Sequence, residues 1–164
     1  MPLRGLLLMI GLAVPLAVRG QQPAVTRFGD PTDGFAQYSG IRDSQRVVIR
    51  DNAVWRRYWA DIHRPFRPSP EPPAVDFSRE IVLLAAMGTR PSGGFIIRID
   101  TATVDSTRMV VQVTQIVPGK GCAVPAVMTQ PVDLVRVPAT RLPVSFTERV
   151  ERTDCSTDWA PDRR

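Results

Sequence analysis

Apolar residues gather in short runs along the chain, separated by turns rich in glycine, proline and aspartate, and this pattern predicts β-strands. Ile97 and Ile99 alternate with polar Arg98, the period of two expected of a strand with one buried face. The runs that we assign as strands lie at 46–50, 81–87, 95–104, 109–117, 132–137 and 144–147.

One helix is predicted between the first two strands. Asp51 is a good N-cap residue, and Trp55, Tyr58 and Trp59 share one face of a helix over 52–62. The strands follow one another across short polar turns, which favours antiparallel pairing. The predicted fold class is therefore α+β, an antiparallel sheet of about six strands with one amphipathic helix packed on one face.

The segment between the strands 81–87 and 95–104 predicts a β-hairpin with a shaped tip. Its glycines permit backbone angles closed to other residues, and its proline stiffens the middle. A loop that holds one shape at a surface favours contact with a partner, although both glycine loops of the chain could be no more than tight turns. The candidate interaction residues are Gly88, Thr89, Arg90, Pro91, Ser92, Gly93, Gly94 and Phe95, with Gly119 and Lys120 of the loop that follows the strand 109–117.

The first residues predict a signal peptide over 1–20. Arg4 precedes an apolar run that is shorter than the ~20 residues of a membrane-spanning helix, and Gly20 offers a small residue at a cleavage site. The chain is therefore expected to be exported, to a periplasmic or extracellular location, with no stable membrane span after cleavage; an uncleaved N-terminal anchor is the alternative. Residues 21–43 predict a flexible N-terminal arm, and 44–164 predict a single domain with a polar C-terminal tail.

The charge of the chain argues against a nucleic-acid partner. The formal net charge is +5, and removal of Arg4 and Arg19 with the first 20 residues lowers it to +3 (5 − 2). The remaining bases are mostly arginines scattered along the chain, whereas a nucleic-acid surface would cluster them.

The two cysteines, Cys122 and Cys155, predict a disulfide in an exported chain. Two free thiols, one buried and one exposed, are the alternative. Two cysteines and one histidine are too few for a zinc site, so no metal is expected.

No set of residues predicts a chemical reaction. His63 is the only histidine and sits at the end of the predicted helix, where it favours a structural role on the last carbonyls. Asp76 and Glu80 form an acid pair that is common on surfaces. We therefore expect no catalytic residues and no cofactor.

Four motifs, taken together, resemble the PrcB family of protease complex subunits. They are Asp76-Phe-Ser-Arg-Glu80, Met87-Gly-Thr-Arg-Pro-Ser-Gly-Gly-Phe95, Pro118-Gly-Lys-Gly-Cys122 and Gln130-Pro-Val-Asp-Leu-Val-Arg-Val-Pro138. The resemblance implies a non-catalytic, exported accessory domain that associates with a secreted subtilisin-like protease. The chain departs from the family pattern because it lacks the lipid-attachment cysteine and has Phe95 where tyrosine is usual.

Three functions compete at this stage. The leading hypothesis is an interaction module that binds a protein partner through the 88–95 tip and the neighbouring 118–125 loop, with Arg90 as a projecting anchor. A second is a protease-inhibitor-like binding domain whose tip enters an active-site cleft. The third is an enzyme, or a protein that binds a small ligand or an envelope polymer, acting through Asp76, Glu80 and Arg90.

Overall fold

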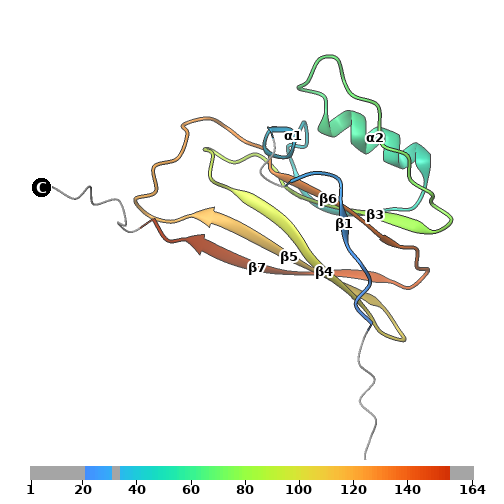
Figure 1. Cartoon of the computed structure of the whole chain (residues 1–164). Coiled ribbons are helices and arrows are strands. Elements are labelled where there is room, and N and C mark those ends of the chain that lie inside the picture. Colours follow the sequence, from blue (N-terminus) through green and yellow to red (C-terminus); the bar gives the residue numbers. More distant parts are fainter. Residues whose placement is uncertain (1–20, 31–33, 156–164) are drawn as a thin grey trace, which may run out of the picture.

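A helix and two β-sheets stack in three layers in the computed structural model, which describes residues 21–30 and 34–155 (Figure 1). The elements, in chain order, are β1 (Thr26–Arg27), α1 (Gly34–Gln37), β2 (Ser44–Ile49), α2 (Asn52–Ile62), β3 (Glu80–Met87), β4 (Ile96–Val104), β5 (Met109–Pro118), β6 (Val132–Pro138) and β7 (Val144–Thr153). The α+β class predicted from the sequence is confirmed, with seven strands in two sheets where about six in one sheet were expected.

The middle layer is a four-stranded sheet of order β1-β6-β3-β2, antiparallel throughout. The outer layer is a three-stranded sheet of order β4-β5-β7, in which β4 and β5 pair antiparallel and β5 and β7 pair parallel. The parallel pair departs from the antiparallel order expected, because β7 reaches β5 only after the chain has crossed to the middle sheet to form β6.

The strand β3 is buried on both faces, which explains its unbroken apolar sequence. One set of its side chains, represented by Leu83, packs against the three-stranded sheet, and the alternate set, represented by Leu84, packs beneath α2. Both of these leucines are completely buried. The middle sheet is therefore the shared wall of two hydrophobic cores.

The predicted hairpin of β3 and β4 is wrong. β3 pairs with β2 on one edge and with β6 on the other, so neither edge is left for β4. The chain instead crosses from the middle sheet to the outer sheet through residues 88–95 (Figure 1). A glycine-rich segment can serve a sheet-to-sheet crossing as well as a tight hairpin, because both require unusual backbone angles.

The helix α2 begins and ends as predicted. The Asp51 side chain accepts a 2.8 Å hydrogen bond from the backbone N–H of Val54 and so caps the first turn. Trp55 and Trp59 are buried against the middle sheet, and their indole N–H groups donate to backbone carbonyls of the proline-rich segment that follows the helix, at 3.0 and 2.9 Å. The indoles thus hold this segment over the helix while their rings fill the core.

A charged cluster joins the two sheets at the border formed by β4 and β6. Asp133 on β6 has a side chain only 2% exposed, and its carboxylate accepts hydrogen bonds from Arg27 at 3.0 Å and from the backbone N–H of Ile99 on β4 at 2.7 Å. Arg27 in turn donates to the carbonyl of Ile99 at 2.6 Å. The two side chains therefore satisfy both backbone groups of Ile99 at the open edge of β4, as a neighbouring strand would.

A second ion pair joins the sheets at the opposite border. Arg46 on β2, whose side chain is 12% exposed, contacts Glu148 on β7 at 2.9 Å. The strand β4 contains a β-bulge at which Asp100 is the extra residue. Ile99 and Ala102 lie three positions apart, which in a regular strand would place them on opposite faces, but the bulge lets both face the core.

The described part of 21–43 packs on the body of the protein. β1 extends the middle sheet beside β6, the Phe28 ring lies 5.0 Å from Trp55, and Ile41 is buried. The expectation of a flexible arm is therefore wrong for the residues that make these contacts. The predicted signal peptide, 1–20, lies outside the described residues, and β7 runs on to Thr153, farther than the predicted strand 144–147.

His63 follows α2 and has the structural role predicted for it. It is buried, its ring centroid lies 4.1 Å from that of Trp59, and its Nδ1 donates to the Trp59 carbonyl at 2.9 Å. Burial lowers the pKa of His63 below its usual 6.5, and this outweighs the opposite effect of the backbone hydrogen bond.

We predict that substitution of Asp133 by Asn destabilises the fold. The change removes the negative charge opposite Arg27, and we expect a loss of about 2 kcal/mol in the free energy of unfolding, less than for a fully enclosed pair because the Arg27 side chain is 28% exposed. Chemical denaturation measures the loss. The matched control is Asp43→Asn, an exposed acid; equal effects of the two substitutions would contradict the role assigned to Asp133.

We also predict that the fold loses stability as the pH falls from about 7 to about 5. The unfolded chain takes up a proton at His63 below pH 6.5, whereas the folded chain, with its lowered pKa, resists protonation until a lower pH. The contribution of neutral His63 to the free energy of unfolding is thus complete above pH 6.5. It declines as the pH falls, until His63 is protonated in the folded state as well. Denaturation at several pH values tests this: His63→Asn, which keeps a donor for the Trp59 carbonyl, should flatten the dependence, and an unchanged slope would refute it.

Candidate functional site

Two loops meet at one end of the molecule, where the sequence analysis placed an interaction face (Figure 1). We name residues 88–95 the crossover loop and residues 119–131 the long loop. Arg90 and Thr129 exchange backbone hydrogen bonds of 2.8 and 3.1 Å, and the N–H of Gly93 donates to the carbonyl of Pro125 at 2.9 Å. The structure therefore brings together the two segments that the sequence predicted to be neighbours.

The glycines of the crossover loop are required by its packing. Gly88 and Gly94 have φ angles of +73° and +83°, which side chains disfavour. A Cβ atom on Gly88 would lie 2.7 Å from the carbonyl oxygen of Arg42, and one on Gly94 would lie 2.7 Å from a methyl carbon of Val124. These two glycines allow the crossover loop to approach its neighbours closely, which is a structural role.

Arg90 does not project from the loop as the leading hypothesis supposed. Its guanidinium folds back, donates a 2.9 Å hydrogen bond to the carbonyl of Met87 and lies 5.8 Å from the centroid of the Phe95 ring. Both residues are half-buried. Arg90 and Phe95 therefore stabilise the start and the end of the crossover loop against each other.

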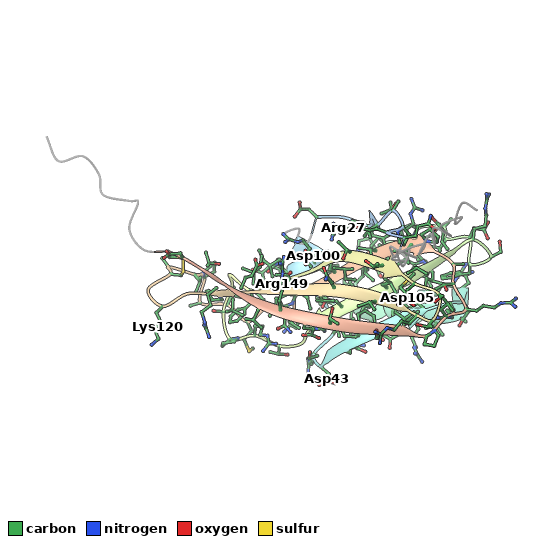
Figure 2. All side chains as sticks on the ribbon, turned by 90° about the horizontal axis from the view of Figure 1, so that it is seen from below. Arg27, Asp43, Asp100, Asp105, Lys120 and Arg149 are labelled. Atoms are coloured by element: carbon green, nitrogen blue, oxygen red, sulfur yellow. A yellow bond between two sulfur atoms is a disulfide. The ribbon has the colours of Figure 1, made fainter. Side chains whose placement is uncertain are left out.

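The long loop is fastened to the end of β7. The predicted disulfide between Cys122 and Cys155 is present, with the Cα atoms 5.1 Å apart. Gly119 lies so close to the carbonyl of Thr153 that a Cβ atom would come within 2.2 Å of that oxygen. Lys120, in the turn between these two attachments, is exposed at the far end of the molecule (Figure 2).

The most exposed apolar surface of the loops was not identified from the sequence. The six residues 123–128 of the long loop are all apolar, and five of them are exposed; Val127 and Met128 reach 40% and 65% exposure. An apolar run that lies between Cys122 and Thr129 and is interrupted by Pro125, a residue that disfavours a paired strand, is the sequence signal that marks it. We name residues 123–128 the apolar segment.

The acids considered as ligand-binding groups have structural partners. The pKa of Asp76 is lowered by hydrogen bonds from the side chain and the backbone of Ser78, and Glu80 lies 3.8 Å from Arg136. Both acids precede or begin β3, whereas Arg90 follows its other end, a separation of about 23 Å along an eight-residue strand. The structure therefore does not bring Asp76, Glu80 and Arg90 into one site.

Among residues 21–30 and 34–155, no group of three or more histidine, cysteine or acidic side chains is placed to hold a metal ion. In the same part of the chain, no helix has the length and apolar character needed to cross a bilayer.

Comparison with known proteins finds that part of the chain matches a family model. Residues 81–138 match the family model described as PrcB C-terminal, a match that runs from β3 to the end of β6 and includes both loops. No curated protein and no solved structure matches the chain. The match suggests an accessory domain associated with a protease complex. Residues 81–138 are therefore similar to the PrcB C-terminal family, the family that the four motifs resemble.

Proposed function

We propose that this chain is an exported, non-catalytic accessory domain that binds a partner protein through the apolar segment of its long loop. A secreted subtilisin-like protease is the partner that the family resemblance favours, and the periplasm or the extracellular space is the proposed location. The observation that carries the proposal is the exposure of five of the six consecutive apolar residues 123–128, on a loop that the fold holds in place.

The attachment of the long loop favours a binding role over a passive one. The disulfide holds the loop before the apolar segment, and the backbone exchange between Thr129 and Arg90 holds it after. A loop fixed on both sides loses little conformational entropy when a partner binds, so more of the apolar contact contributes to affinity.

Export is supported by the paired cysteines. Disulfides persist in oxidising compartments and are rare in the cytosol, and the bond between Cys122 and Cys155 is accompanied by an N-terminal sequence typical of signal peptides.

We predict that charging the apolar segment weakens partner binding without unfolding the domain. In the double variant Val127→Asp, Met128→Asp, two carboxylates would have to be buried at the interface, and we expect capture to fall at least about tenfold. The melting temperature should remain close to that of the unmodified chain because both side chains are exposed. The measurement is a pull-down with tagged residues 21–164 from envelope and secreted fractions, with mass spectrometry of the retained proteins.

The matched control is Ala74→Asp, an exposed apolar residue of the proline-rich segment, which should capture the partner normally. Undiminished capture by the double aspartate variant would reject the apolar segment as the interface. If the unmodified, folded domain retains no protein, small ligands and envelope polymers become the leading candidates. A captured protease whose turnover falls on binding would favour the inhibitor-like hypothesis.

A further inference from the structure

The strand β7 is an edge of the outer sheet along its whole length. It pairs with β5 over ten residues, and no other strand of the described chain pairs with its opposite side. It forms the outermost ribbon of the lower sheet in Figure 1, and residues 147–153 are all exposed. An edge of this length presents unpaired backbone donors and acceptors, the groups through which strands recruit one another.

The backbone groups that face outward on β7 can be assigned from its pairing. In the register Met109↔Val144, the N–H of Met109 donates to the carbonyl of Pro143 at 2.9 Å. Because alternate residues of a strand direct both backbone groups to the same side, Pro143 and every second residue after it face β5. The residues whose N–H and C=O face the free edge are Val144, Phe146, Glu148, Val150 and Arg152.

The free edge has a charge pattern that complements itself. Residues 147–153 read Thr-Glu-Arg-Val-Glu-Arg-Thr. When this segment is laid antiparallel to a second copy of itself with Val150 opposite Val150, Glu148 faces Arg152 and Arg149 faces Glu151. Each acid of one copy then opposes a base of the other, and the two threonines oppose each other.

We propose that β7 pairs antiparallel with β7 of a second copy of this chain, about a two-fold axis at Val150, to make one continuous six-stranded sheet. The interface is isologous, since each copy contributes the same residues to it. This inference rests on β7 alone and is independent of the partner proposed for the apolar segment.

The backbone supports the same register as the charges. Glu148, Val150 and Arg152 all direct their N–H and C=O to the free edge, so each directly opposed pair among them forms a hydrogen-bonded pair that exchanges two backbone hydrogen bonds. Moving the axis by one residue to Arg149 or to Glu151 places two like charges directly opposite each other, which is unfavourable. Of these neighbouring two-fold registers, the one centred on Val150 alone opposes every charge with its opposite.

The side chains of residues 147–153 are exposed, although Glu148 and Arg149 also have partners within the chain, with Arg149 donating to the Thr114 hydroxyl at 2.7 Å. Val150 is 61% exposed, an unusual position for a large apolar residue, and the second copy would cover it with the same side chain. Arg152 has no ion-pair partner among the described residues, although Glu148 is already oriented by Arg46. Arg149 lies on the outer face of the sheet near Asp100, where it contacts Glu151 at 3.1 Å (Figure 2).

The test is sedimentation equilibrium on residues 21–164, which contain every described element, up to about 1 mM, where complexes of millimolar Kd are half-formed. The unmodified chain should form a dimer. Glu151→Arg places Arg149 opposite a second arginine, and Arg149→Glu places Glu151 opposite a second glutamate. Each variant alone should dimerise at least about tenfold more weakly, because two unlike pairs become like pairs by symmetry.

Mixing the two variants is the decisive step. Across a mixed pair, Arg149 of one variant faces the unchanged Glu151 of the other, and the two introduced residues face each other with opposite charges, so the mixture should regain the dimer. Arg56→Glu, an exposed reversal on α2, is the matched control and should dimerise as the unmodified chain does. A chain that stays monomeric at about 1 mM, a single variant as tight as the unmodified chain, or a mixture no tighter than its components would each overturn the proposal.

Discussion

The architecture depends on the burial of β3 on both faces and on both edges. A strand with no exposed side requires a cover above, a cover below and a neighbour on each edge, and the chain supplies α2, the outer sheet, β2 and β6 in these places. This requirement determines the long connections as well. The chain must leave the middle sheet after β3, form β4 and β5 in the outer sheet, and return to place β6 beside β3. The crossover loop and the long loop are those two passages, and for this reason they lie together.

The two sheets are joined by charge at their borders and by apolar packing between them. Arg27 and Asp133 occupy the border at β4, and Arg46 and Glu148 occupy the border at β7. At the first border the carboxylate and guanidinium replace the hydrogen bonds that a further strand would make to Ile99. The backbone of Ile99 is thereby satisfied at the edge of β4, whereas no strand of the described chain pairs with the free edge of β7. This difference between the two edges of one sheet points to β7 as the edge open to association.

Much of the secondary structure could be predicted from local sequence. The helix over Asn52–Ile62 follows from the Asp51 cap and its aromatic face, and the disulfide follows from two cysteines in a chain whose first residues predict a signal peptide. The division into two sheets could not be predicted in this way, because an unbroken apolar run shows that a strand is buried without showing which strands take its edges. The packing of 21–43 escaped prediction because Arg27 gains its partners, Asp133 and Ile99, from 106 and 72 positions away in the sequence.

The candidate site, like the fold, was predicted only in part from the sequence. The proximity of the crossover loop and the long loop, and the family over 81–138, followed from short motifs. The orientation of Arg90 did not, because an arginine beside glycines can project or fold back equally well until the carbonyl of Met87 is in place. The apolar segment was overlooked because its residues are those expected of a core, and only the tertiary structure shows that five of the six are exposed.

The bulge at Asp100 lets β4 keep one face on the core although its apolar residues change spacing. Ile97 and Ile99 face the core before it, Ala102 and Val104 face the core after it, and Asp100 is the extra residue between the two halves. If the same sequence paired without a bulge, the second half of the strand would turn over, placing Thr101 and Thr103 in the core and Ala102 and Val104 outside. Loss of Asp100 itself, by contrast, would leave an ordinary strand whose two halves already share one face. Among related sequences the bulge and its extra residue should therefore be gained or lost together, while the pairing of both halves with β5 is kept.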